Sequence, residues 1–249
     1  MPGTLYLVPT PLGEGDLAWI LPDAVRQRAA ELDHYIVEHP KTARQFLKRI
    51  GCVQPLQRIS MSVLDEHTSS SQLPGLLTPL LEGTDVGLLS EAGCPAVADP
   101  GAQLVRLAHQ KNLRVVPLVG PSSILLALMA SGLNGQCFAF QGYLPVENSR
   151  RVKKIAELEK ESVIHGQTQI FIETPYRNQK LMELIVSVCQ PDTGLCVACN
   201  LTQPDEYIAT RTIRQWKDYP LDLDKKPSIF LLHGCATHRT GTARYHNPP

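Results

Sequence analysis

Two hydrophobic periods alternate along the first half of the chain. Short runs of apolar and β-branched residues predict strands, and apolar residues spaced for one helical face predict helices. The strands are predicted over residues 4–8, 32–37, 59–64, 86–89 and 115–119. Helices are predicted after Pro22 and over residues 42–50, 73–81, 101–110 and 124–130. Because strand and helix alternate at spacings that suit crossover helices, this half predicts an α/β fold with a parallel sheet.

The second half has a different pattern, with one long charged helix and several further strands, some of which we expect to pair antiparallel. Extended segments or strands are predicted over residues 138–145, 169–173, 195–201, 207–210 and 228–233, and helices over 149–164 and 177–189. A boundary near residue 120 predicts two α/β domains, over residues 1–120 and 121–237. Residues 238–249 are polar and contain Gly and Pro, which predicts a flexible tail.

Local signals predict the ends of two helices. Asp99 can accept hydrogen bonds from first-turn N–H groups of the helix that follows it, and Pro100 suits the first helical position. Thr42 is expected to cap the helix after the second strand, and Gly51 is expected to end it.

Composition limits the classes of function. The chain has 249 residues, of which 43% are hydrophobic and 19% charged, as in a globular protein with a substantial core. Its net charge of zero argues against binding of polyanions by the overall field, but a local basic patch stays open. We find no secretory signal pattern and no apolar run of the roughly 18–20 residues that a membrane span needs. These features predict a cytoplasmic protein.

Seven cysteines lie at scattered positions, which is not the pattern of a disulfide framework. Cys196 and Cys199 form a C-x-x-C pair within a predicted strand. Residues three apart on a strand point to opposite faces, and no second pair of ligands lies nearby in the sequence. We therefore predict no metal site at this pair.

Small and polar residues gather in four loops that follow predicted strands. These loops cover residues 9–15, 90–98, 120–123 and 173–177. The glycine fingerprints of dinucleotide-binding and P-loop proteins are absent. In open α/β sheets, ligands bind outside the carboxyl ends of the strands. The loops therefore predict a small ligand that is held largely by backbone groups.

Four segments in this order resemble the tetrapyrrole methylase superfamily. They are Leu7–Gly13, Ser90–Pro95 with Asp99–Gly101, Val119–Ser123 and Phe171–Arg177. Within the superfamily, the resemblance is closest to the branch that methylates a ribose 2′-hydroxyl of bacterial 16S rRNA. The resemblance implies two α/β domains with S-adenosylmethionine bound in a cleft between them. It also implies a homodimer and methyl transfer without a metal.

The resemblance further implies residues that bind the cofactor. The expected cofactor-binding residues are Pro9, Ser90, Glu91, Ala92, Val97, Ser122, Ser123, Glu173, Thr174 and Pro175. Ser122 and Ser123 precede a helix, where orphan N–H groups could meet the cofactor carboxylate or could simply be capped. A carboxylate near the sulfonium would offset its positive charge.

A ribose hydroxyl is a poor nucleophile, so a nearby base would help the reaction. The expected catalytic residues are Glu38, His39, Lys41 and Glu91, and Glu66 and His67 are further candidates. The expected substrate-binding residues are Arg44, Arg150, Arg151, Lys153, Lys154 and Arg177. Each of these residues can also have an ordinary structural role: Arg150–Lys154 can be a solvated helix face, and Glu173 with Arg177 can form a structural ion pair.

The chain departs from the rRNA branch at several positions. That branch usually has Glu-Asp-Thr-Arg after the second strand, where this chain has the longer segment Glu38-His39-Pro40-Lys41-Thr42-Ala43-Arg44. It also usually has Asp and Thr where this chain has Glu91 and Cys94. A Glu-Leu-Thr-Lys pattern of the branch appears as Asn200-Leu201-Thr202-Gln203. The expected activity is methylation of an rRNA ribose. Methylation of a carbon in a tetrapyrrole, or in another small molecule, and a non-catalytic protein that binds S-adenosylmethionine stay open as alternatives.

Overall fold

The computed structural model describes residues 1–235, which form two compact units. Unit 1 comprises Met1–Leu126 and Asn200–Glu206, and unit 2 comprises Ala127–Cys199 and the described residues from Tyr207 onward. The predicted domain boundary after residue 120 stays a prediction. The units divide within helix α7 (Ser123–Ser131). The predicted tail, residues 238–249, lies outside the described residues.

Unit 1 contains a five-stranded sheet in which all strands run parallel, as the sequence predicted. The strands are β1 (Thr4–Val8), β2 (His34–Val37), β3 (Ser60–Val63), β4 (Val86–Leu89) and β5 (Arg114–Pro117). Their order in the sheet is β3-β2-β4-β1-β5. Short buried strands such as β4 are apolar on both faces because helices cover both sides of a parallel sheet.

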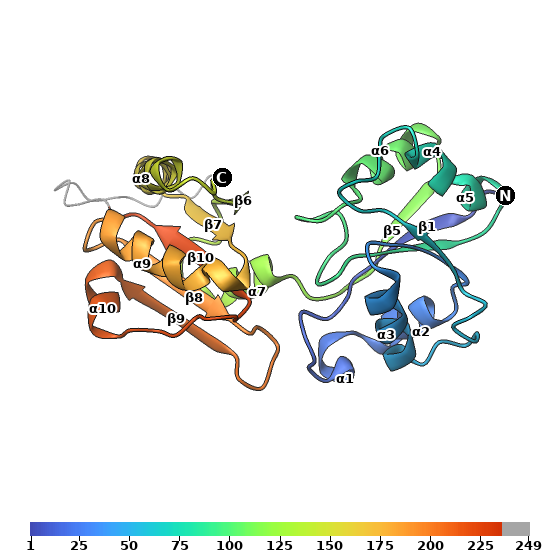
Figure 1. Cartoon of the computed structure of the whole chain (residues 1–249), viewed down its shortest axis with the longest axis horizontal. Coiled ribbons are helices and arrows are strands. Elements are labelled where there is room, and N and C mark those ends of the chain that lie inside the picture. The colour runs from blue at the N-terminus through green and yellow to red at the C-terminus, as the bar shows by residue number, and fades with distance from the viewer. Residues whose placement is uncertain (236–249) are drawn as a thin grey trace, which may run out of the picture. The chain divides into compact units, whose positions relative to one another are not determined.

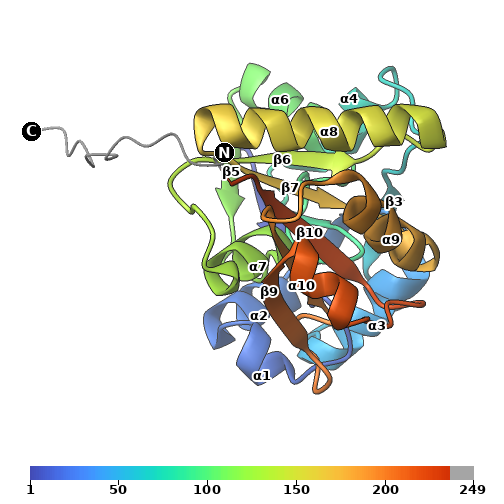
Figure 2. The same cartoon turned by 90° about the vertical axis from the view of Figure 1, so that its left-hand side faces the viewer.

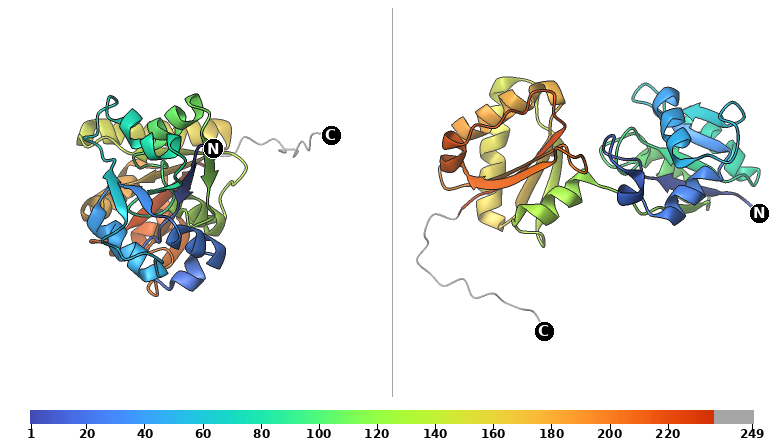
Figure 3. Two further views of the ribbon diagram at one scale, coloured as in Figure 1. Left: turned by 90° about the vertical axis from the view of Figure 1, so that its right-hand side faces the viewer. Right: turned by 90° about the horizontal axis from the view of Figure 1, so that it is seen from below.

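The helices of unit 1 lie on both faces of its sheet (Figures 1 and 3). They are α1 (Leu17–Ile20), α2 (Asp23–Ala30), α3 (Pro40–Ile50), α4 (Leu73–Leu76), α5 (Thr78–Leu81) and α6 (Ala102–Gln110). One core joins α3, through Phe46 and Leu47, to Val37 and Leu89. A separate core joins α6 to the other face of the same strands. Successive side chains of a strand point to opposite faces, so the same short strands supply both cores.

Two predicted helix caps are wrong. Helix α6 begins at Ala102, after Gly101 with φ of 136°, and no side chain caps it. Asp99 therefore does not cap this helix. Helix α3 begins at Pro40, whose missing N–H suits the first turn, so Thr42 lies inside the helix and is not its cap. Gly51 ends α3 in the left-handed conformation, with φ of 74°, as predicted.

Unit 2 contains a mixed five-stranded sheet with the order β6-β7-β10-β8-β9 (Figure 2). The strands are β6 (Phe138–Tyr143), β7 (Thr168–Ile172), β8 (Gly194–Cys199), β9 (Tyr207–Thr212) and β10 (Ser228–His233). β6 and β7 pair parallel, and the other neighbours pair antiparallel, which confirms the predicted antiparallel pairing. The fold class, two α/β units, is therefore confirmed.

Three α-helices of unit 2 pack through one hydrophobic core. They are α8 (Asn148–His165), α9 (Asn178–Val188) and α10 (Ile213–Asp218). The 3-10 helix η1 (Pro175–Arg177) precedes α9 and has no buried residue. Ile155 of α8, Leu181 of α9 and Trp216 of α10 belong to the same buried cluster as Phe171 and Phe230 of the sheet. Trp216 also donates a hydrogen bond from Nε1 to the Leu195 carbonyl, which satisfies its buried polar atom.

Candidate functional site

The candidate site lies in unit 1, at the carboxyl edge of the sheet between β2 and β4. The chain leaves β2 toward β3, and leaves β4 in the opposite direction, toward β5 beyond β1. The helices that follow these strands, α3 and α6, accordingly belong to cores on opposite faces of the sheet. Neighbouring strands whose connections diverge in this way form a topological switch point, where open α/β sheets bind ligands.

Three of the four predicted loops meet at this edge. The backbone N–H and C=O of Thr10 pair with those of Gly93, at N···O distances of 2.9 and 3.0 Å. The Thr10 hydroxyl donates to the Ser90 carbonyl at 3.2 Å, and Cys94 Sγ donates to the Pro121 carbonyl at 3.4 Å. Loops that follow β1, β4 and β5 are thereby fixed to one another.

The loops approach so closely that two positions require glycine. A Cβ at Gly120 would lie 2.2 Å from Cγ of Pro9. Gly93, with φ of 81°, adopts the left-handed conformation at the bridge to Thr10. The small residues recognised in the sequence therefore serve loop packing as well as access to the backbone.

The structure distributes the predicted cofactor-binding residues of unit 1 over these loops. Pro9 and Ser90 are buried, Ser122 and Ser123 are half-buried at the start of α7, and Glu91, Ala92 and Val97 are exposed. Their role in binding stays a prediction. The fourth loop, which holds Glu173, Thr174 and Pro175, belongs to unit 2.

The predicted catalytic residues Glu38, His39 and Glu91 gather at the switch point. Glu91 Oε1 lies 3.6 Å from His39 Nδ1 and accepts a hydrogen bond from Thr42 Oγ1 at 2.7 Å. The Thr42 hydroxyl is also 2.9 Å from the His39 carbonyl oxygen. The structure therefore brings together residues that are about fifty positions apart, and adds Thr42, whose sequence position indicated only a cap.

Carboxyl groups at this edge influence one another. Burial raises the pKa of Glu38 above its usual range, and the neighbouring Glu91 raises it further. Burial also raises the pKa of Asp99 to about 6, with smaller contributions from Glu38 and Glu91, although a hydrogen bond with the Ser90 side chain opposes the shift. Sequence reasoning missed Asp99 as part of this cluster, because its interpretation as a cap used only the local chain.

The raised pKa of Asp99 predicts a pH dependence of stability. Between the ordinary Asp pKa of 3.8 and about 6, the folded state binds more protons than the unfolded state, so stability decreases as pH rises through this window. We expect Asp99→Asn to increase the free energy of unfolding at pH 7 by about 1–2 kcal/mol, after allowance for partial solvent screening, and to flatten the dependence. Calorimetry at pH 4 and pH 7 measures both effects.

The control for this prediction is Asp33→Asn, which removes an exposed carboxylate of the same unit. It should leave the difference between pH 4 and pH 7 as in the wild-type protein. An Asp99→Asn variant with an unchanged pH dependence would contradict the prediction.

The other candidates of unit 1 lie at the surface. Lys41 and Arg44 are exposed on α3. Glu66 and His67 contact each other at 3.6 Å with more than four fifths of each side chain exposed. The structure brings none of these four into a described contact with Glu91 or His39, and their roles stay predictions.

Two buried polar atoms without partners lie beside the first loop. Thr202 Oγ1 and Gln203 Nε2 have no hydrogen-bond partner among the described residues. Both belong to the segment Asn200–Glu206, which is part of unit 1. A Cβ at Gly13 would lie 2.5 Å from Gln203 Nε2, and one at Gly15 would lie 2.6 Å from the Thr202 carbonyl oxygen. Buried polar atoms are nearly always satisfied, so a ligand that supplies hydrogen bonds fits this position.

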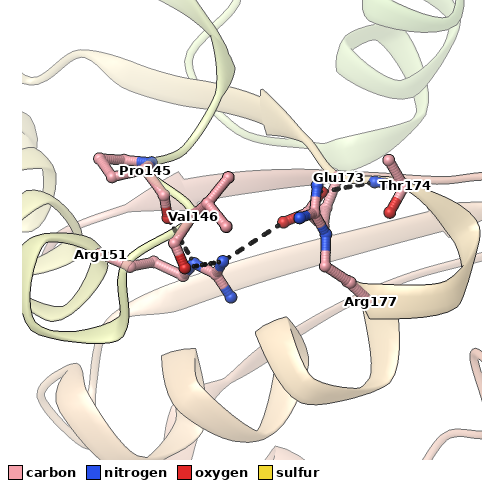
Figure 4. A network of polar contacts seen from close by, with 6 residues as sticks. All are labelled: Pro145, Val146, Arg151, Glu173, Thr174 and Arg177. Carbon is pink, nitrogen blue, oxygen red and sulfur yellow. Dashed lines mark hydrogen bonds and ion pairs between the residues drawn. The ribbon is translucent and has the colours of Figure 1, made fainter.

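A buried network in unit 2 joins Glu173 to two arginines (Figure 4). Glu173 Oε1 accepts hydrogen bonds from Arg177 Nη2 and from the Thr174 backbone N–H, both at 2.7 Å. Arg151 Nη2 lies 3.7 Å from Glu173 Oε2. Arg151 also donates to the carbonyl groups of Pro145 and Val146. The network links β7, η1 and α8, which supports the alternative of a structural ion pair for Glu173 and Arg177.

The four basic residues near the start of α8 differ in their surroundings, because only Arg151 belongs to the Glu173 network. The side chain of Arg151 is only 9% exposed, because its donors are used inside unit 2. Arg150 and Lys153 are exposed, Lys154 is half-buried, and Arg150 pairs with Glu147 at 3.0 Å. The helical period in the sequence indicated that Arg151 is buried, because Arg151 shares a helix face with the buried Ile155 and Leu158.

The cysteine pair gives no sign of a metal site among the described residues. No group of three or more His, Cys, Asp or Glu within residues 1–235 is arranged to hold a metal ion. Cys196 and Cys199 are both buried in β8. Among the described helices, none is both long and apolar enough to cross a membrane.

Comparison with known proteins decides the family. The model of the family "Tetrapyrrole (Corrin/Porphyrin) Methylases" matches residues 4–216. The chain belongs to the tetrapyrrole methylase family. It is therefore a methyltransferase, as the resemblance of its four loops implied.

Relatives of this tetrapyrrole methylase include proteins named Ribosomal RNA small subunit methyltransferase I. The protein of Vibrio cholerae is 30% identical over 92% of this chain and 77% of its own length. The protein of Mesorhizobium japonicum is 35% identical over 86% of this chain and 69% of its own length. The solved structure of the methyltransferase CobJ has the same fold, with a TM-score of 0.62 and 17% identity over 96% of this chain and 97% of that structure.

Proposed function

We propose that this methyltransferase transfers the methyl group of S-adenosylmethionine to a ribose 2′-hydroxyl in RNA of the small ribosomal subunit. The observation that carries the proposal is the meeting of three small-residue loops with a histidine and two glutamates at the switch point of unit 1. The names of the relatives favour RNA over a tetrapyrrole as the substrate.

The residues of unit 1 fit the proposed cofactor in charge and in hydrogen-bonding capacity. S-adenosylmethionine supplies an activated methyl group on a positively charged sulfur. Glu38 and Glu91 are carboxylates that offset a positive charge, and the unpartnered atoms of Thr202 and Gln203 can bind its polar groups. We propose that the predicted cofactor-binding residues of unit 1 form this site: Pro9, Ser90, Glu91, Ala92, Val97, Ser122 and Ser123.

The chain itself must align the hydroxyl and the methyl group and must accept a proton. Alignment is a proximity effect, which fixed loops supply because their geometry changes little on binding. For the RNA, we propose that Arg44, Arg150, Lys153 and Lys154 contact phosphates, since phosphate contacts position a nucleic acid. Arg151 and Arg177 would not contact phosphates directly, because Glu173 binds both guanidinium groups. They would contribute to RNA binding only through the Glu173 network.

We also propose that the protein is a homodimer and acts in the cytoplasm, where ribosomal RNA is found. Leu125 and Met129 of α7 support a partner surface, because 52% and 80% of these large apolar residues are exposed. Light scattering on the purified protein measures the proposed mass of two chains.

Calorimetric titration and a transfer assay test the proposed function. We expect S-adenosylmethionine to bind with a dissociation constant on the order of 1–100 µM. We expect a labelled methyl group to be transferred to small ribosomal subunits from a strain without this gene, and mass spectrometry of RNA fragments should place it on a ribose. Absence of binding would overturn the cofactor. Binding without transfer to RNA would favour a binding protein, and transfer to a porphyrinoid would favour the tetrapyrrole alternative.

A further inference from the structure

His39 has a ring nitrogen at the switch point that contacts no other described residue. Its Nδ1 faces Glu91 Oε1 at 3.6 Å, and its Nε2 has no partner in the described part of the chain. About two thirds of the side chain is exposed, so Nε2 can meet a large substrate. In a neutral imidazole, one ring nitrogen donates a hydrogen bond and the other accepts one. The neighbour of one nitrogen determines which of the two carries the proton.

Glu91 is itself held in position. Thr42 Oγ1 donates to the same Oε1 atom that faces His39, and Thr42 lies one turn after His39 at the start of α3. Because His39 follows β2 and Glu91 follows β4, the pair bridges the two strands whose connections diverge. A carboxylate fixed in this way orients an imidazole and stabilises the imidazolium that proton transfer produces.

The surroundings of His39 are strongly acidic. Electrostatic interactions connect Glu38 to His39 and to four further carboxyl groups, those of Asp65, Glu66, Glu91 and Asp99. On its own helix, the nearest cationic side chains are those of Lys41 and Arg44, both exposed.

The other candidates are less suited to accept the proton. Glu38 is half-buried, and Oε1 of Glu91 is occupied by Thr42. A lysine ammonium such as that of Lys41 has donors but no acceptor. Oε2 of Glu91 has no partner among the described residues, but a carboxylate is ordinarily a weaker base than an imidazole, so His39 is the best suited of the four.

We propose that His39 is the general base of the reaction, and that Glu91, held by Thr42, is its positioning residue. Nε2 takes the proton of the ribose hydroxyl while its oxygen forms a bond to the methyl carbon. The carbon–sulfur bond breaks, and its electron pair stays on sulfur as a neutral thioether. The proposal rests on the proposed function.

Single-turnover and steady-state kinetics with small ribosomal subunits test the proposal. We expect His39→Ala to lower kcat by about 10²–10⁴-fold with little change in KM for RNA or in cofactor affinity. Added imidazole should raise the kcat of this variant by about tenfold or more and should leave the wild-type rate unchanged. A merely structural histidine would not be replaced by a free base.

Coupling to Glu91 is tested by a double-mutant cycle. We expect Glu91→Gln to lower kcat by about tenfold in the wild-type protein and by less than about twofold in the His39→Ala background. The control is His109→Asn, which changes an exposed histidine in the last turn of α6, at the other end of that helix from the site. This variant should retain wild-type kinetics.

The outcomes separate this inference from the proposed function. A wild-type protein that binds cofactor but methylates no RNA would overturn the proposed function, and the inference with it. An active wild type whose His39→Ala variant keeps its kcat, or gains nothing from imidazole, would overturn the inference alone. If Glu91→Gln lowered kcat equally in the wild-type and His39→Ala backgrounds, Glu91 would not be a positioning residue of His39.

Discussion

We expect Glu173→Ala to lower the free energy of unfolding of unit 2 by about 3–5 kcal/mol, which is the usual cost of removing one partner from a buried ion pair. Glu173 is buried and forms ion pairs with two guanidinium groups. Without it, the 9% exposed side chain of Arg151 keeps its charge with only carbonyl oxygens as partners. The same change should loosen η1, because the Thr174 N–H and Arg177 lose their acceptor.

Tryptophan fluorescence during urea denaturation can measure this effect in unit 2 alone. The chain has two tryptophans, and only Trp216, which is buried, lies in unit 2. In a Trp19→Phe background, the signal therefore reports unit 2. Glu157→Gln, at an exposed position on α8, is the matched control and should stay within about 0.5 kcal/mol of the parent. A Glu173→Ala protein as stable as this control would show that the network does not stabilise the unit.

The second large effect is expected at Gly120, where two loops of unit 1 touch. A new Cβ would lie 2.2 Å from Pro9 Cγ and 3.1 Å from Leu21 Cδ2, so the first loop must move. We expect Gly120→Ala to lower the free energy of unfolding of unit 1 by about 1–3 kcal/mol, as overpacking does. The displaced loop contains Pro9, a proposed cofactor-binding residue. Because a misplaced loop binds its ligand less well, affinity for S-adenosylmethionine should fall by about tenfold or more.

Gly75→Ala provides the control for this change. A Cβ at Gly75 meets no atom within 4 Å, and the residue lies in helix α4 of the same unit. We expect this variant to be as stable as the wild type or slightly more stable, since Ala is a better helix former than Gly. Thermal unfolding and calorimetric titration measure both variants. Wild-type affinity in Gly120→Ala would contradict a role of this loop contact in cofactor binding.

Helix starts and short helices were less predictable than strands. The strand β4 matched its predicted range, because four consecutive apolar residues buried on both faces give an unambiguous pattern. The short helix α10 was missed, although Thr212 and Gln215 form a capping box at its start. Its six residues are too few for a clear hydrophobic period.

For the candidate site as well, some features followed from the sequence and others only from the tertiary structure. The sequence by itself determined the α/β class, the parallel first sheet and the loops with small residues, because burial pattern and backbone freedom are local properties. Only the tertiary structure decided which side chains meet. Asp99 and Thr42 carry local signals of helix caps, but α3 and α6 begin elsewhere and leave both residues at the switch point. Arg151 has the local signal of a basic surface, but the turn of α8 directs it to the buried Glu173. Charge pairing and proton affinity depend on neighbours that are distant in the chain, and those neighbours are fixed by the order of the strands.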